Sequence, residues 1–342
     1  MHILSTIAGI ALVVTVLWEV FETIVLPRRV TREFRLTRLF YRATWIPWTA
    51  IANLRRNKKK RDSLLSFYGP LSLLLLLVFW AVTLILGFAF IHYGVSQFAG
   101  SLPSGRFGTA LYMSGTTLFT LGLGDVTPAT TLSRVITVVE AGIGFGFLAL
   151  VIGYLPVLYQ SFSRREVTIS LLDARAGTPP TAYELLRRHS GPEGYEALTE
   201  VLEDWERWAA ELMESHLSYP ALAYFRSQHD NQSWLGSLVA ILDACSLAMV
   251  GLEGMCQYQA RMTFAIARHA LVDLSQVFSA APAADATLVR MSAEQLAELR
   301  RRLEQLSIRL SDHDGADGHL EALPVMAPST LVTPAVTGLV VH

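Results

Sequence analysis

Three apolar segments, each long enough to cross a lipid bilayer, constrain this chain more than any other feature of its sequence. They cover residues 3–26, 67–93 and 132–159. At about 1.5 Å per residue, each can form a helix that spans a hydrocarbon core about 30 Å thick. Hydrophobic residues make up 52 % of the 342 residues and charged residues only 17 %, which is too apolar for an ordinary soluble protein. We therefore expect an all-α membrane protein with three spanning helices.

Basic residues are concentrated between the first and second apolar segments. Residues 27–62 hold twelve Arg and Lys against two acids, whereas residues 164–342 hold fourteen against twenty-three. Cytoplasmic loops carry this excess of Lys and Arg, so we expect the loop 27–66 inside the cell. The N-terminus is then outside and the chain after about residue 160 is cytoplasmic. Because the basic block lies between two spans, it favours a plasma (inner) membrane protein over a nucleic-acid binder.

The first apolar segment, within residues 1–26, is expected to stay in the mature protein. A signal peptide carries positive charge before its apolar region, whereas here the charge begins afterwards, at Arg28 and Arg29. Within the basic loop, residues 34–54 mix Arg with Phe, Tyr and Trp. This composition predicts a helix in the headgroup plane, in contact with membrane lipids, and a solvated linker is the alternative.

The segment between the second and third spans has two parts. Residues 107–119, "FGTALYMSGTTLF", form about three turns of a largely uncharged helix, and "TLGLGD" follows directly. Non-helical backbone at membrane depth is tolerated only where protein surrounds it or where it lines a water-filled path. Gly122 and Gly124 can adopt positive φ at no Cβ cost. The sequence therefore predicts a short re-entrant helix followed by a bare strip of backbone that lines a pore.

This arrangement resembles the pore module of potassium channels, whose usual filter reads Thr-Val-Gly-Tyr-Gly-Asp. The resemblance covers residues 67–160, with an extra N-terminal span before it. It implies a potassium-selective channel that transports potassium passively and uses no cofactor. Because the chain holds one filter segment, it also implies a homotetramer. The implied potassium ligands are the carbonyls of Thr120, Leu121, Gly122 and Leu123, with the Thr120 hydroxyl at the inner end and Gly124 completing the strip.

Two positions of the strip depart from the family pattern. Leu123 stands where the family has a Tyr whose hydroxyl holds the filter open, and Phe119 stands where a second Thr is common. Leucine cannot donate that hydrogen bond, so we expect Leu123 to pack on apolar parts of Tyr112 and Met113. A weakly selective cation channel is therefore an alternative. Other residues expected to support the filter are Thr116, Asp125 and Glu140.

Glu140 is the one acid within the third span. An ionisable residue at this depth is costly and faces protein or water. We expect it to bond the pore helix at Thr116 or Thr117, with a pairing to Arg134 as the alternative.

The same span is rich in residues at which helices bend. By resemblance, a gating hinge is expected around Gly142, Gly144, Gly146 and Pro156. Close packing of helices through small residues explains the glycines equally well.

Residues 161–311 have the composition of a soluble helical domain. "TAYE" at 181–184 predicts a helix start, and residues 198–217 repeat apolar side chains at helical spacing. Residues 234–250 are expected to form a buried core helix rather than a fourth span. The leucine seam at 296–310 predicts either an intersubunit coiled coil or packing onto the domain. Residues 312–342 are expected to be a disordered tail.

Several function classes lack support in the sequence. No G-x-G-x-x-G follows a strand, so a nucleotide-binding regulatory domain is not expected. No span is rich in Arg, so no voltage sensor is expected. No catalytic constellation is present, so an enzyme is not expected. No regulatory ligand is predicted. A membrane-anchored sensor or scaffold with a vestigial pore is the alternative from a different class.

Overall fold

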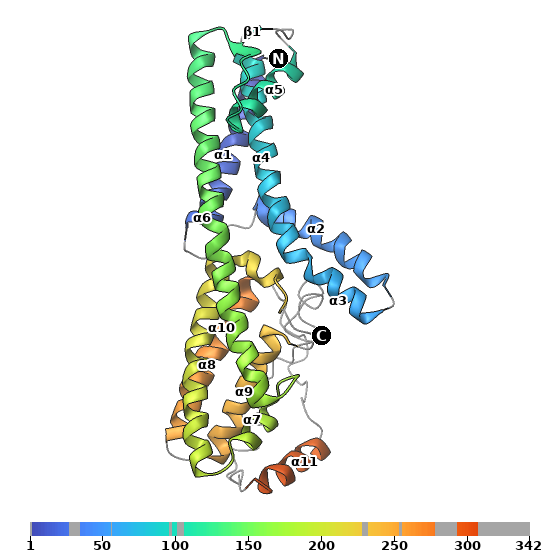
Figure 1. The fold of residues 1–342 in the computed structure, drawn as a ribbon, viewed down its shortest axis with the longest axis vertical. Helices are drawn as coiled ribbons and strands as arrows, with labels where there is room; N and C mark the ends of the chain where they lie inside the picture. Colours follow the sequence, from blue (N-terminus) through green and yellow to red (C-terminus); the bar gives the residue numbers. More distant parts are fainter. Residues whose placement is uncertain are drawn as a thin grey trace. The chain divides into compact units, whose positions relative to one another are not determined.

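A computed structural model describes residues 2–26, 35–55, 57–95, 98–100, 106–227, 232–252, 255–277 and 293–306. The predicted tail at 312–342 lies outside the described residues. The described chain is almost entirely helical (Figure 1). Four of its helices are long and apolar enough to cross a membrane, and they include all three predicted spans. This agrees with the predicted all-α membrane fold.

The chain divides into two compact units. Residues up to 44 belong with residues 70–159, and residues 45–69 belong with the described residues from 160 onward. The second part of the predicted basic loop thus joins the unit that holds the C-terminal helices. Hydropathy alone did not predict this division.

In the first unit, helix α1 (His2–Val20) continues as a π-helix over Phe21–Val25, and helix α4 covers Tyr68–Val95. Small residues bring α1 close to α4. A Cβ added at Gly9 would lie 2.4 Å from the carbonyl oxygen of Gly87, which no side chain tolerates. Such close approach is how helices associate where water supplies no driving force between them.

Between α4 and the next long helix, a two-stranded ribbon joins the two ends of the intervening segment. Strand β1 (Phe98–Gly100) pairs antiparallel with strand β2 (Val126–Pro128), so that Gly100 stands opposite Val126. Helix α5 (Phe107–Leu118) lies between them in sequence and matches the predicted pore helix within one residue. Helix α6 (Thr131–Ala176) then runs 46 residues without a break, well past the predicted end of the third span.

Two helices occupy the basic loop: α2 (Leu36–Asn53) and α3 (Lys58–Ser66). The predicted helix over 34–54 is therefore present. Its second half packs on protein: the Trp45 and Tyr68 rings are 4.6 Å apart, and Trp48 Nε1 donates to the Leu64 carbonyl at 3.2 Å. The aromatic residues that suggested a lipid surface thus form protein contacts as well.

The C-terminal helices of the second unit are α7 (Ala182–Arg188), α8 (Pro192–Ser218), α9 (Trp234–Gly251), α10 (Met255–Val277) and α11 (Ala293–Glu304), with a 3-10 turn at Pro220–Tyr224. They surround a hydrophobic core, and most of the residues of α9 are buried in it or beside it. On α8, the predicted apolar stripe is buried at Leu198, Val201, Leu202, Trp205, Trp208 and Leu212.

Two local predictions for the second unit have clear outcomes. Thr181 caps α7, because its side chain accepts from the Glu184 N–H at 3.3 Å. In the leucine seam, Leu303 is fully buried in the core, and Leu299 and Leu306 pack against it. Within the described part of the seam, packing onto the domain is therefore the observed alternative.

Candidate functional site

The C-terminus of α5 holds the start of the "TLGLG" strip through backbone hydrogen bonds. The Thr116 carbonyl accepts from the N–H groups of Leu121 (2.8 Å) and Gly122 (3.4 Å), and the Thr117 carbonyl accepts from Thr120 N–H (2.9 Å). A helix leaves its last carbonyls without intrahelical partners, and here the following strip supplies them. The N–H groups of the strip thus donate to the helix end. The carbonyls of the strip are a separate set of groups and can accept other ligands.

The strip has an alternating backbone conformation. φ is +57° at Thr120, +55° at Gly122 and +80° at Gly124, and Thr120 is the only described non-glycine residue with positive φ. An L-residue other than glycine adopts this region at a cost of about 1–2 kcal/mol. In the strip, residues with positive φ alternate with residues with negative φ, which turns successive carbonyl groups to the same side. In a β-strand, by contrast, successive carbonyl groups point to opposite sides. Such a strip presents a row of carbonyls, which is what coordination of a dehydrated cation requires.

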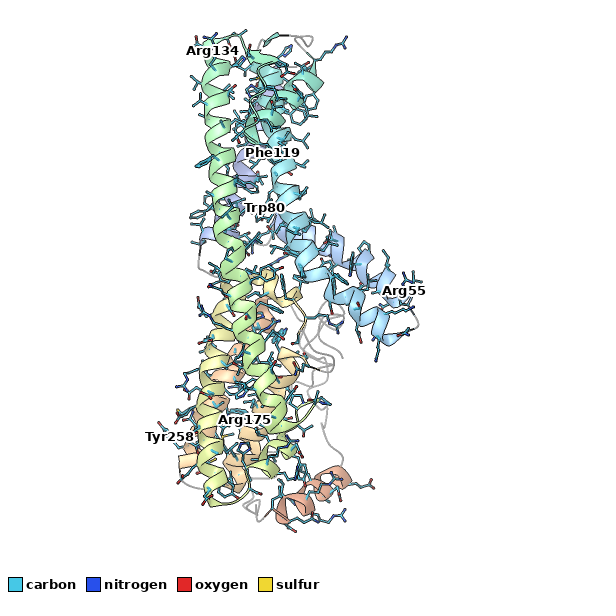
Figure 2. The ribbon with its side chains drawn as sticks, in the orientation of Figure 1. Arg55, Trp80, Phe119, Arg134, Arg175 and Tyr258 are labelled. Carbon is cyan, nitrogen blue, oxygen red and sulfur yellow. The ribbon has the colours of Figure 1, made fainter. Side chains whose placement is uncertain are left out.

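The strip is uncovered in a single chain. All residues from Phe119 to Asp125 are exposed, with Leu121 at 62 % and Leu123 at 64 %. Figure 2 labels Phe119 just after α5 and Arg134 near the start of α6, and the strip rises between them. Polar backbone in a membrane must be covered by protein or face water. In a membrane, the strip must therefore be covered by further protein or line a water-filled path.

The C-terminal end of the strip is fixed to α5 by a polar contact. Tyr112 Oη donates to Asp125 Oδ2 at 2.8 Å, and Asp125 Oδ1 accepts from Val126 N–H at 3.2 Å. Met113 is buried in a small cluster with Ala110 and Val126, which Tyr112 joins. The packing of Leu123 on Tyr112 and Met113 stays a prediction, because Leu123 is 64 % exposed in the single chain.

Glu140 lies fully buried behind α5. Its carboxylate accepts from the Ser114 hydroxyl through Oε1, and its Oε2 lies 2.9 Å from Nε2 of His92 on α4. The expected bond to the pore helix is therefore made, but to Ser114 instead of Thr116 or Thr117. Arg134, the alternative partner, donates to the Pro128 carbonyl at 3.3 Å. The Thr116 hydroxyl donates within its own helix, to the Met113 carbonyl at 2.9 Å.

The glycines of α6 have different surroundings. A Cβ added at Gly144 would lie 2.2 Å from the Leu118 carbonyl oxygen, whereas Gly142 and Gly146 have open space around the same position. Gly144 thus lets α6 approach the end of α5, which is the packing role. Pro156 is exposed within the same continuous helix.

Sequence reasoning missed His92 and Ser114. His92 follows a run of uncharged apolar residues and is the one histidine among residues 67–93. That signal pointed to a polar partner within the membrane. Ser114 had no comparable signal, because serine is common in packed helices.

Comparison with known proteins bears on the same region. A family model described as "Ion channel" matches residues 73–160, from α4 through α5 and the strip into α6. No curated protein and no solved structure matches the chain. The match supports an ion channel function for these residues. The fold is that of an all-α membrane protein, in which residues 73–160 are similar to ion channels.

Proposed function

We propose that this chain is one subunit of a homotetrameric, potassium-selective channel that conducts passively. The observation that carries the proposal is the strip from Thr120 to Gly124. Positive φ occurs at every second residue, and the end of α5 binds the first three N–H groups of the strip. Four copies around an axis supply rings of carbonyl oxygens from Thr120, Leu121, Gly122 and Leu123, with the Thr120 hydroxyl at the inner end. Rings of this kind replace the hydration shell of a potassium ion.

The electrostatics of α5 favour a cation at this place. Its C-terminus carries the negative end of the helix dipole, and it ends directly at the strip. Neighbouring subunits cover the exposed strip and the apolar side chains that α6 exposes in the single chain, among them Phe145, Leu148 and Ile152. We place the protein in the plasma membrane, with the N-terminus outside the cell and the second unit in the cytoplasm. The basis for this orientation is the positive charge of the basic loop.

Residues behind the strip hold it in register. Asp125 and Tyr112 fix its outer end, Thr116 its inner end, and Glu140 ties α5 to α4 and α6 through His92 and Ser114. We assign these residues to filter support. Gly144 packs α6 on α5, and any bending of α6 occurs at Gly142, Gly146 or Pro156.

The test is a reversal potential measured on purified protein in lipid vesicles under opposed potassium and sodium gradients. A potassium channel reverses near the potassium equilibrium potential. A reversal near zero instead supports a weakly selective cation channel, which Leu123 favours because it cannot donate the usual hydrogen bond. Absence of flux under every gradient and lipid would overturn the proposal in favour of a sensor or scaffold.

A further inference from the structure

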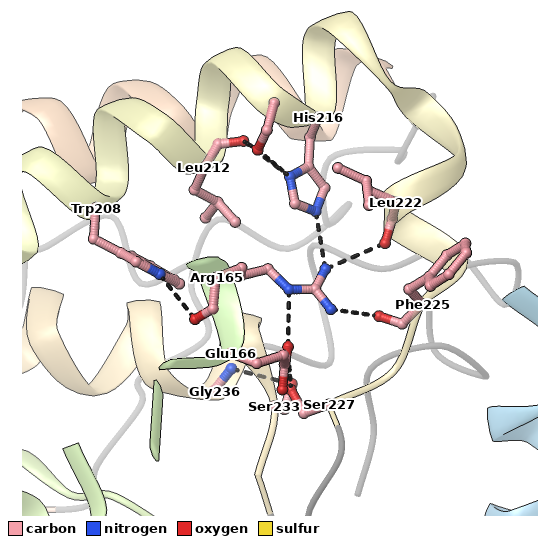
Figure 3. Close-up of polar contacts among 11 residues, drawn as sticks. Arg165, Glu166, Trp208, Leu212, His216, Leu222, Phe225, Ser227, Ser233 and Gly236 are labelled. Carbon is pink, nitrogen blue, oxygen red and sulfur yellow. Dashed lines mark hydrogen bonds and ion pairs between the residues drawn. The ribbon is translucent and has the colours of Figure 1, made fainter. Parts of the chain in front are cut away.

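A buried arginine of the second unit fixes α6 to a short segment after α8. Arg165 is 4 % exposed, and its guanidinium donates from Nη1 to the Leu222 carbonyl (3.2 Å) and from Nη2 to the Phe225 carbonyl (2.7 Å). Its Nε donates to Glu166 Oε1 at 3.0 Å (Figure 3). The planar fork of arginine matches this set of acceptors, and the point charge of lysine does not.

His216 completes the network in its neutral form. Its Nδ1 lies 2.9 Å from the Leu212 carbonyl, and its Nε2 lies 3.2 Å from Arg165 Nη1. Burial, reinforced by the charge of Arg165, lowers the pKa of His216 to about 3. A neutral ring with its proton on Nδ1 donates to Leu212 and accepts from Arg165. The side chain thus supports the arginine without adding a second positive charge.

The opposite side of the same segment contacts the start of α4 and the basic loop. The Tyr224 ring lies 5.5 Å from the Tyr68 ring and 5.8 Å from the Trp45 ring. A Cβ added at Gly69 would lie 2.6 Å from the Tyr224 carbonyl oxygen, so the backbones are in direct contact. Arg226 pairs with Asp62 of α3 at 3.4 Å. Residues 222–226, the coupling segment, thus contact three helices besides α6.

These contacts link the two helices that the proposed pore requires. Helix α6 is continuous from Thr131 to Ala176, so Arg165 lies on the same helix as the residues beside the strip. Tyr68 and Gly69 begin α4. On the proposed channel function, we infer that Arg165 is a positioning residue for gating, which holds α6 to the coupling segment and thereby to the start of α4. Movement of the coupling segment within the second unit can then move α6 and so open or close the proposed pore.

The inference is tested in the full-length protein in vesicles by single-channel recording. Arg165→Lys keeps the charge but loses the fork, so we expect open probability to change by about tenfold or more, in either direction, since hydrogen bonds to charged groups have that strength. Unitary conductance and the potassium-to-sodium permeability ratio should stay unchanged, because the strip is untouched. The matched control is Arg164→Lys on the exposed neighbour, expected to change open probability less than about twofold.

A second variant tests transmission through the coupling segment. Arg226→Gln removes the ion pair with Asp62 on the far side and does not touch the Arg165 network. If the coupling segment joins α6 to α3 and the start of α4, the variant that carries both Arg165→Lys and Arg226→Gln changes open probability no more than the larger single variant. Independent, multiplicative effects would overturn the inference, as would an unchanged open probability in a conducting Arg165→Lys protein. A wild type without current overturns the proposed function itself, so the two failures differ.

Discussion

Nε2 of His92 lies 2.9 Å from Oε2 of Glu140, and neither side chain has any exposed surface. The pair joins α4 to α6, and Ser114 adds α5 to the same network through Glu140 Oε1. A buried polar group without partners is costly, so each member depends on the others. Three helices that meet only after the chain has folded are therefore held together at one point near the strip from Thr120 to Gly124.

Replacement of Glu140 tests this lock. Glu140→Leu removes one hydrogen-bond partner from both His92 and Ser114, and Ser114 Oγ keeps the Ile85 carbonyl as an acceptor at 2.9 Å. We expect a loss of roughly 1–3 kcal/mol of stability per subunit. Glu140→Gln keeps hydrogen-bonding capacity and should fold, with altered gating. Thermal unfolding of the purified protein in detergent measures the first effect, and single-channel recording measures the second. Equal stability of both variants with the wild type would contradict the assignment.

Alanine at two glycines of α6 separates packing from bending. Gly144→Ala places a Cβ against the Leu118 carbonyl, so α5 must shift and potassium flux should be lost. Gly142→Ala meets open space in the chain and raises helix propensity by about 1 kcal/mol. We expect it to be stable, with slower opening if α6 bends there. Vesicle flux and melting temperature are the measurements, and the opposite order of effects would refute the packing role of Gly144.

The filter assignment is tested at neighbouring positions. Gly122→Ala adds a Cβ where φ is +55°, at a cost of about 1–2 kcal/mol that a ring repeats in every subunit. Conduction should collapse. Leu123→Tyr alters a side chain whose backbone conformation any residue adopts, so it should be far milder. Both variants are first checked for intact oligomers by size-exclusion chromatography. Normal selectivity in Gly122→Ala, together with lost flux in Leu123→Tyr, would show that the strip is not the ion ligand.

Acidification should loosen the second unit around His216. The pKa of His216 is about 3 in the folded chain against a usual 6.5. Above pH 6.5 the ring is neutral in both states, so its contribution to stability is complete. As pH falls below 6.5, the unfolded state binds a proton that the folded state does not, and stability is lost progressively until about pH 3. Between pH 7 and pH 5 the loss is about 2 kcal/mol.

Hydrogen exchange of the full-length protein measures this effect. Amides of residues 212–225 should exchange faster at pH 5 than at pH 7, after correction for the intrinsic rates. His216→Gln cannot titrate, so this extra acceleration should be absent from it. An equal pH response in both proteins would assign the effect to other groups.

Local chemistry made part of this protein predictable. The spans follow from apolar runs of sufficient length, and helix α5 with the non-helical strip after it follows from an uncharged segment that ends in two glycines. The cap at Thr181 and the stripe on α8 follow from spacing along a single helix. Each of these depends on neighbours in sequence, which a pattern contains.

The amino-acid sequence by itself thus determined the helical membrane fold, the short helix α5 and the position of the strip. The tertiary structure alone decided that Glu140 binds Ser114 and His92, that Gly144 is a packing residue, and that Arg165 binds carbonyls of residues 222–225. These contacts join residues 26 to 60 positions apart. Helical periodicity gives the face on which a side chain lies, but the partner depends on which helices meet and at what register.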